Sequence, residues 1–255
     1  MILTKLYDPT KGTMQVAGFM SGSGSNLRKI IEHENELNKN SKSPYHIAVI
    51  FSDNPDSNAA KIGRDYDRPV IIRDLRSFCA ARGKSRKDLD TRVEYDEETI
   101  KALTPYNIQS VAYAGYMCIV TAPLIKAFLG VNVHPADLSI MREGKRVYVG
   151  DKAVKDAIMA GENELRSTTH IIEREVDQGK ILMISKPIKV SLPDTANFRD
   201  NNAFAKEHQE RLKVVGDLEI FPLTLQYIAE GRFAKDETGL IYFDNKSIPD
   251  GIRLN

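Results

Sequence analysis

Short apolar runs alternate with amphipathic segments through the first 134 residues of the chain. The apolar runs predict strands over Met14–Phe19, His46–Phe51, Pro69–Ile72, Gln109–Ala114 and Val131–Val133. Apolar residues at helical spacing predict helices over Leu27–Leu37, Ser57–Tyr66, Lys87–Leu103 and Pro123–Phe128. Strands and helices that alternate through short loops are typical of an open, mostly parallel, twisted α/β sheet with helices on both faces, as in Rossmann-like folds.

The pattern changes after Gly150. It predicts a helix over Asp151–Met159, strands over Ser167–Ile172 and Ile181–Val190, a long helix over Asn202–Ala229 and a hairpin over Phe233–Phe243. Pro222 should divide or kink the long helix, because proline lacks the N–H that a helix interior needs. No linker rich in Pro, Gly or Ser interrupts the chain, which favours one domain, 1–255, with 1–13 as an N-terminal extension.

The composition is that of an ordinary globular protein. Hydrophobic residues make up 42% and charged residues 28% of the 255 residues, and the net charge is +1. A charge this close to zero argues against a nucleic-acid partner, and the lack of a long apolar run argues against a membrane span. Cys79 and Cys118 show no metal-ligand spacing and Met1–Thr13 is no signal peptide, so we expect a cytoplasmic protein without a metal.

A loop rich in glycine and serine, Ser21–Asn26, joins the first predicted strand to the first predicted helix. Its small residues let the backbone approach an anion, and the N–H groups at the helix start favour phosphate. Gly24, Ser25 and Asn26 are therefore candidate phosphate ligands. A dinucleotide site is disfavoured, because Leu27 occupies the position of the third glycine of that motif. A tight turn with a good helix cap is the alternative that involves no ligand.

His134 ends a predicted strand in Asn132-Val133-His134-Pro135, at the edge where open α/β sheets bind ligands. Strand alternation places Asn132 and His134 on the same side. A carboxylate in the later turn, Asp177, would orient His134 and raise its pKa toward the range that suits a general acid. A carboxamide beside an imidazolium is also a suitable donor pair for an oxyanion. A structural histidine held by an aspartate is the alternative.

Four segments, in this order and at this spacing, resemble the phosphoribosylglycinamide formyltransferase family. They are the strand–Ser21-Gly22-Ser23-Gly24-Ser25-Asn26-Leu27–helix start, Ala114-Gly115-Tyr116-Met117, Asn132-Val133-His134-Pro135 and Glu175-Val176-Asp177-Gln178-Gly179. The similarity spans about residues 14 to 250. It implies a formyltransferase fold and an enzyme that moves the formyl group of 10-formyltetrahydrofolate, without a metal, to the amine of glycinamide ribonucleotide in purine biosynthesis.

The resemblance also implies which residues meet each ligand. Residues 14–134 would form a phosphate-binding half, in which Gly24, Ser25 and Asn26 hold the phosphate of the small phosphorylated amine. The folate would lie against Arg86, Met117, Cys118, Ile119, Val120 and Asn132. A homodimer is compatible with the resemblance.

Residues 135–255 would then form the catalytic and C-terminal half. Asn132 and His134 would stabilise the oxyanion that forms when the amine attacks the formyl carbon. The resemblance assigns Asp177 to raising the pKa of His134 and to moving a proton through water. These three residues are the predicted catalytic set.

Three departures from the family pattern concern the ligands. The stretch Ala136–Arg146 differs from the Ser-Leu-Leu-Pro-like segment that usually follows His-Pro, and this loop should approach the acceptor amine. Cys118 replaces an expected arginine, and Asp217 is the nearest match to a glutamate that grips the acceptor. The departures do not affect the residues expected for formyl transfer, but they leave the identity of the acceptor amine open.

Other members of the formyl-transfer group provide alternatives. A formyltetrahydrofolate hydrolase would carry an extra N-terminal domain, whereas 13 residues precede the first strand here. A formyltransferase for initiator tRNA would need a further C-terminal domain and a basic surface. A formyltransferase for a sugar nucleotide, or for another phosphorylated amine, fits the altered loop. A non-catalytic phosphate-binding relative is disfavoured by the intact set of Asn132, His134 and Asp177.

Overall fold

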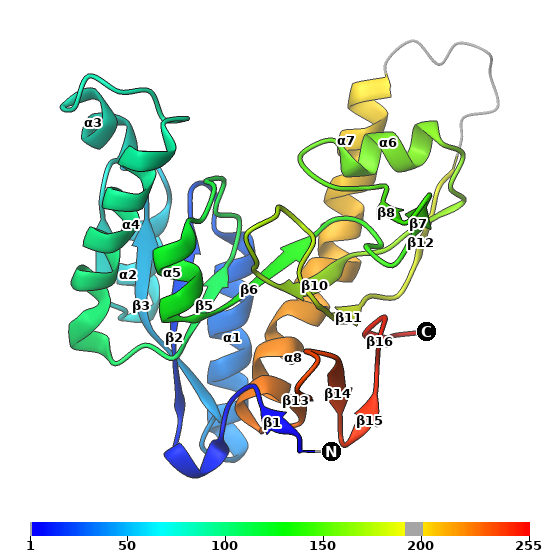
Figure 1. Cartoon of the computed structure of the whole chain (residues 1–255), viewed down its shortest axis with the longest axis horizontal. Coiled ribbons are helices and arrows are strands. Elements are labelled where there is room, and N and C mark those ends of the chain that lie inside the picture. The colour runs from blue at the N-terminus through cyan, green and yellow to red at the C-terminus, as the bar shows by residue number, and fades with distance from the viewer. Residues whose placement is uncertain (1, 192–200) are drawn as a thin grey trace.

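The centre of the fold is a mixed, mostly parallel sheet of eight strands (Figure 1). The computed structural model describes residues 2–191 and 201–255. The strand order is β16 (Ile252–Arg253), β11 (Ile181–Ile184), β10 (Thr168–Ile171), β6 (Leu129–His134), β5 (Ser110–Tyr113), β2 (Met14–Met20), β3 (Tyr45–Ser52) and β4 (Val70–Ile72). The five strands from β6 to β4 are parallel, which confirms the predicted fold class.

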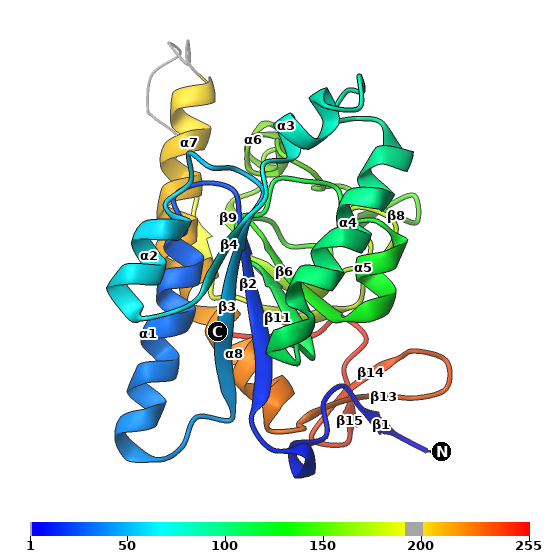
Figure 2. The same cartoon turned by 90° about the vertical axis from the view of Figure 1, so that its left-hand side faces the viewer.

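Helices cover both faces of the parallel part (Figure 2). One face packs against α1 (Ser25–Asn40), α2 (Ala59–Tyr66) and α8 (Leu218–Ala229), and the other against α3 (Leu75–Ala80), α4 (Leu89–Leu103) and α5 (Ala122–Ala127). Strand β2 supplies both cores, because Val16 points to the first layer and Phe19 to the second. This two-sided burial explains why the parallel strands read as continuous apolar runs in the sequence.

Strand β10 runs antiparallel to β6 and brings the second half of the chain beside the first. The register places His170 opposite Asn132 and Thr168 opposite His134. The intervening chain forms a small lobe with β7 (Met141–Arg142), β8 (Lys145–Arg146), α6 (Ala153–Met159) and β9 (Glu164–Leu165), and with β12 (Ile188–Lys189) and α7 (Asn201–Leu212). The proposed functional division at 134/135 stays a prediction.

Two elements of the second half differ from expectation. The run Ile181–Val190 is not one strand, because β11 ends at Ile184 and β12 begins after Pro187 and pairs with β9. Proline cannot donate to a strand ladder, so the break falls beside it. The sequence pattern also missed the β7–β8 hairpin, whose turn residues Glu143 and Gly144 both have positive φ.

The long C-terminal helix is interrupted, but not at Pro222. A π-helical turn, Lys213–Asp217, separates α7 from α8, and Pro222 lies inside α8. Such turns mark local insertions into a helix and are frequent at functional sites. A Cβ on Gly216 would lie 2.4 Å from Ser167 Oγ, so the glycine lets this turn approach β10 closely. The position of the break is therefore set by tertiary packing.

The N-terminal strand joins three strands that follow α8 in a separate small sheet. The N-terminal strand β1 (Thr4–Lys5) pairs with β13 (Phe233–Lys235), which pairs in turn with β14 (Ile241–Phe243) and β15 (Lys246–Ser247). The β13–β14 pair confirms the predicted hairpin. Of the helices in the described part of the chain, none has the length and apolarity that a bilayer crossing requires.

We expect Gly179→Ala to destabilise the fold strongly. A Cβ at this position would lie 1.7 Å from the carbonyl oxygen of Ile171, and a backbone oxygen in a strand cannot move aside as a side chain can. The expected loss is about 2 kcal/mol or more of unfolding free energy, measured by urea denaturation. The matched control is Gly22→Ala, where an added Cβ meets nothing within 4 Å. Equal stabilities of the two variants would contradict this account.

Candidate active site

A cavity of about 720 Å³ opens at the carboxyl ends of β2, β5 and β6. Four segments line it: the glycine loop 21–26, the loop 113–120, the strand end 132–135 and the turn segment 172–177. Side chains from the end of α7 and the π-helical turn close the remaining side. The cavity therefore brings the predicted phosphate loop and the predicted catalytic residues into one space, as expected for the ligand-binding edge of an open α/β sheet.

The glycine loop has the backbone geometry of an anion site. Gly24 adopts a left-handed conformation with φ of 71° and precedes the first residue of α1, Ser25, without a side-chain cap. A Cβ there would lie 2.4 Å from Ile62 Cδ1 and 2.7 Å from Met20 Cε, so both conformation and space require glycine. The first N–H groups of α1 have no side-chain cap, and Ser25 and Asn26 line the cavity, so these N–H groups could bind an anion.

Asn26 links this loop to the π-helical turn. Its side chain is 9% exposed and hydrogen-bonds the carboxyl group of Asp217, while its Oδ1 has no protein partner among the described residues. Asp217 also accepts a hydrogen bond from Ser167 Oγ at 2.5 Å. Burial raises the pKa of Asp217 to about 6, against the opposing effect of these hydrogen bonds. The loop, β10 and the π-helical turn are thus held together by one buried carboxyl group.

Two of the predicted catalytic residues, His134 and Asp177, form a buried pair. His134 Nδ1 lies 3.4 Å from Asp177 Oδ2, and His134 Nε2 lies 2.9 Å from the carbonyl oxygen of Tyr148. Because a carbonyl only accepts, His134 carries a proton on Nε2 and turns Nδ1 toward the carboxylate. Both ring nitrogens therefore face protein oxygens. His134 is 5% exposed and Asp177 is 8% exposed.

Electrostatics in the cluster differ in part from expectation. Burial lowers the pKa of His134 below its ordinary value, and the charge of Asp177 raises it without overcoming burial. Burial on its own raises the pKa of Asp177, but the contacts from His170, His134 and the Gly150 N–H outweigh this and lower it to about 2. Asp177 is therefore charged at neutral pH. It raises the pKa of His134, as expected, but this pKa stays below its ordinary value because burial has the larger effect.

His170 is a member of the cluster that the sequence reasoning missed. Its Nε2 lies 3.5 Å from Asp177 Oδ1 and 3.2 Å from Asn132 Nδ2, and its Nδ1 lies 3.0 Å from the carbonyl oxygen of Ile171. Nδ1 donates to that carbonyl, and Nε2 lies between the Asn132 amide and the Asp177 carboxylate, while the second amide N–H of Asn132 has no protein partner in the described part of the chain. In the sequence, His170 is only a histidine inside a predicted strand. Its place beside Asn132 follows from the register between β10 and β6, which the sequence pattern does not give.

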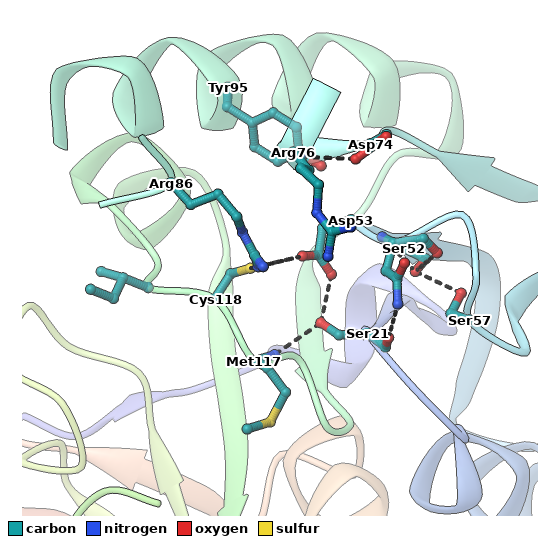
Figure 3. A network of polar contacts seen from close by, with 12 residues as sticks. Ser21, Ser52, Asp53, Ser57, Asp74, Arg76, Arg86, Tyr95, Met117 and Cys118 are labelled. Atoms are coloured by element: carbon teal, nitrogen blue, oxygen red, sulfur yellow. Dashed lines mark hydrogen bonds and ion pairs between the residues drawn. The ribbon is translucent and has the colours of Figure 1, made fainter. Parts of the chain in front are cut away.

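The loop 116–120 is tied to the glycine loop by Asp53 (Figure 3). The buried carboxylate accepts from Ser21 Oγ at 2.5 Å and from Cys118 Sγ at 2.8 Å, and Ser21 Oγ accepts from the Met117 N–H at 2.9 Å. Arg86 lies 3.6 Å from the same carboxylate. The predicted folate-contacting segment and the predicted phosphate loop therefore share one anchor.

The predicted folate-contacting residues fall into two groups. Met117, Cys118, Ile119 and Val120 line the cavity, and Met117 and Ile119 are 68% and 53% exposed, which is unusual for large apolar side chains. Arg86 is not part of the cavity wall but contacts Cys118 Sγ at 3.3 Å and Asp53. Burial and the bond to Asp53 raise the pKa of the Cys118 thiol to about 11, so it acts as a hydrogen-bond donor and not as a nucleophile.

Within residues 2–191 and 201–255, no group of three or more His, Cys, Asp or Glu side chains is arranged to hold a metal ion. One cavity thus contains an uncapped helix start, an amide donor and a buried imidazole–carboxylate pair, which are groups that can stabilise developing negative charge.

Similarity to known proteins shows which family the chain belongs to. The formyl transferase family model matches residues 14–215, so the chain belongs to that family. It is an enzyme of the folate-dependent transferase class, with a folate-derived formyl donor and an amine acceptor.

Individual relatives agree with this assignment. The chain is 26% identical over 239 residues to phosphoribosylglycinamide formyltransferase of Haemophilus influenzae, covering 92% of this chain and 96% of that one. It is 28% identical over 238 residues to the chloroplastic phosphoribosylglycinamide formyltransferase of Arabidopsis thaliana, covering 92% and 72%. The structure of the Coxiella burnetii phosphoribosylglycinamide formyltransferase superposes with a TM-score of 0.72 at 20% identity, over 95% of this chain and 100% of that one, and shows that the fold is shared.

We expect Asp177→Asn to lower stability at neutral pH by about 2 kcal/mol, because the folded pKa lies near 2 and the unfolded one near 3.8. A depressed folded pKa adds stability above the unfolded pKa, and this contribution is lost as pH falls toward the folded value. The gap in unfolding free energy between wild type and variant should therefore stay constant from about pH 7 to about pH 5 and narrow from there toward about pH 2 in urea unfolding. The exposed control Asp56→Asn should differ from wild type by less than about 0.5 kcal/mol. A pH-independent gap for Asp177→Asn would exclude the charge as its cause.

Proposed function

We propose that the enzyme transfers the formyl group of 10-formyltetrahydrofolate to the primary amine of glycinamide ribonucleotide, in purine biosynthesis and in the cytoplasm. The observation that carries the proposal is the single cavity lined by the glycine loop, the 113–120 loop and Asn132, His134 and Asp177. A volume of about 720 Å³ lies in the range of small-molecule sites. The relatives whose names include this activity align over nearly the whole chain.

The chemistry asks for stabilisation of an oxyanion and for the movement of one proton. The amine nitrogen attacks the formyl carbon, and the carbonyl oxygen becomes negatively charged in a tetrahedral intermediate. The second amide N–H of Asn132 is the donor that faces the cavity without rearrangement. His134 can donate from Nε2 once the ligand oxygen replaces the Tyr148 carbonyl as its partner.

Proton balance assigns the remaining role to Asp177. The attacking amine loses one proton as the carbon–nitrogen bond forms, and N10 of the folate gains one as the bond to the formyl carbon breaks. Asp177 stays ionised and stabilises the imidazolium form of His134, and it can orient a water molecule through which the amine proton passes on toward N10. The net reaction needs no oxidant and no reductant.

The acceptor phosphate would bind at the glycine loop. Gly24, Ser25 and Asn26 provide helix-start N–H groups, and Lys213 lines the same cavity from the π-helical turn. Lysine beside such a turn supplies the compensating charge that a phosphate needs. The sequence pattern had not singled out Lys213.

A sugar nucleotide amine, or another phosphorylated amine, is the second candidate acceptor. The observation in its favour is the β7–β8 hairpin, which replaces the expected family segment after His-Pro and carries its own turn. Asp217 is the nearest match to the glutamate that grips the acceptor in the family, but here its carboxyl group is bound to Asn26 and Ser167. This difference also favours another acceptor. A non-catalytic ligand-binding role would require that the buried cluster has no turnover.

The direct test is incubation with 10-formyltetrahydrofolate and a panel of amines, with formylated product followed by mass. The panel should contain glycinamide ribonucleotide, glycinamide without phosphate, and amino-sugar nucleotides. We expect turnover with glycinamide ribonucleotide and little with the unphosphorylated amide. Turnover with an amino-sugar nucleotide alone would select the second candidate, and formylation of none would refute both.

We expect His134→Ala to reduce kcat with the preferred acceptor by about 100-fold or more, because oxyanion and general acid contributions are each of that order. Circular dichroism should confirm that the variant is folded. His46→Gln is the matched control, since His46 contacts Glu34 and lies outside the cavity wall. A kcat for His134→Ala within a fewfold of wild type would remove His134 from the mechanism.

A further inference from the structure

The β7–β8 hairpin reaches across the cavity margin to the turn that carries Asp177. Arg146, at the end of β8, donates from Nη1 to the carbonyl oxygens of Asp177 at 2.5 Å and of Gly179 at 2.9 Å. Two further contacts come from the same loop: the Gly150 N–H donates to Asp177 Oδ2 at 2.8 Å, and the Tyr148 carbonyl accepts from His134. The loop that departs most from the family pattern thus contacts both members of the catalytic pair.

The Asp177 turn needs such support. Asp177 has φ of 55°, a left-handed conformation that is less favourable than the right-handed one for every residue except glycine, although Asp and Asn adopt it more readily than most. Its carboxylate must also lie between two imidazoles, 3.4 Å from His134 and 3.5 Å from His170. A small rotation of the turn would lengthen both contacts, so the geometry depends on what holds the backbone carbonyls.

We propose that Arg146 is a positioning residue, whose guanidinium holds the backbone of the Asp177–Gly179 turn so that the Asp177 carboxylate stays against His134. The contact between Arg146 and this turn is part of the fold, whereas its effect on turnover rests on the proposed formyl transfer. Arg146 touches no reacting atom in this scheme. It acts on the reaction through Asp177.

The direction in which the pKa of His134 changes when Arg146 is removed tests the proposal. The charged and titratable groups that face the pair or line the adjoining cavity wall are Arg146, Asp151, His170, Glu173, Arg174, Glu175 and Asp177. As a nearby positive charge, Arg146 disfavours the imidazolium form of His134, whereas Asp177 favours it. If Arg146 were only a charge, its removal would raise the pKa of His134. If it positions Asp177, its removal lowers that pKa.

The measurement is an NMR titration of the His134 ring in wild type, Arg146→Met and Arg146→Lys. We expect the pKa of His134 to fall by about 0.5 to 1 unit in Arg146→Met, since a carboxylate within hydrogen-bonding distance raises it by about that much or more. Both bonds come from Nη1, whose direction is set by the rigid, planar guanidinium. Arg146→Lys keeps the charge but not this fixed geometry, so the pKa of His134 should fall in the same direction. Lys145→Met, which removes the adjacent exposed cation of β8, is the matched control and should leave the pKa unchanged.

A double-mutant cycle isolates the route of action. In an Asp177→Asn background, Arg146→Met should no longer lower the pKa of His134, because the carboxylate through which it acts is gone. An unchanged or raised pKa in both Arg146 variants of the wild-type background would overturn the proposal. So would an undiminished fall in the Asp177→Asn background.

Kinetics provide a second and separate readout. With whichever amine the wild type formylates, Arg146→Met should lower kcat about tenfold or more and leave the KM of the donor within a fewfold, as expected for misplacement of a catalytic group. The titration needs no substrate, so a wild-type enzyme that formylates no amine would defeat the proposed function without touching the positioning result. A native kcat in Arg146→Met would defeat the positioning role alone.

Discussion

The structure of the site depends on one buried carboxylate, Asp177, held between two imidazoles. Its oxygens face His134 at 3.4 Å and His170 at 3.5 Å, and the Gly150 N–H fixes one of them at 2.8 Å. An ionised carboxylate so far from water persists only when it is paired and hydrogen-bonded. This requirement joins three segments of chain, namely the end of β6, the strand β10 and the loop before α6.

A second buried carboxylate, Asp53, joins two of the loops that line the cavity. Asp53 accepts from Ser21 and Cys118 and lies beside Arg86, so it ties the glycine loop to the 116–120 loop. The thiol donates to Asp53, and burial with this bond raises its pKa to about 11. Cys118 is therefore a short internal donor, and Arg86 places a positive charge beside Asp53.

Local patterns allowed much of the fold to be predicted. The apolar runs around Val16 and Val131 predicted strands that are buried on both faces, because such runs can be recognised from a few neighbouring residues. The break at Lys213–Asp217 could not be predicted, because it follows from the close approach of Gly216 to Ser167 across the fold. His170 was missed for the same kind of reason, since its place beside Asn132 comes from an antiparallel register between strands 38 residues apart.

By itself the sequence determined the alternating α/β architecture, the glycine turn that leads into α1 and the strand-end placement of Asn132 and His134. These properties arise from residue spacing and backbone preference, which act over a few neighbours. Only the tertiary structure decided the partners and charge of the site: that burial outweighs Asp177 in setting the pKa of His134, that His170 completes the cluster, and that Arg146 reaches the Asp177 turn. Burial and long-range hydrogen bonds depend on chain segments more than thirty residues apart, and no local pattern encodes them.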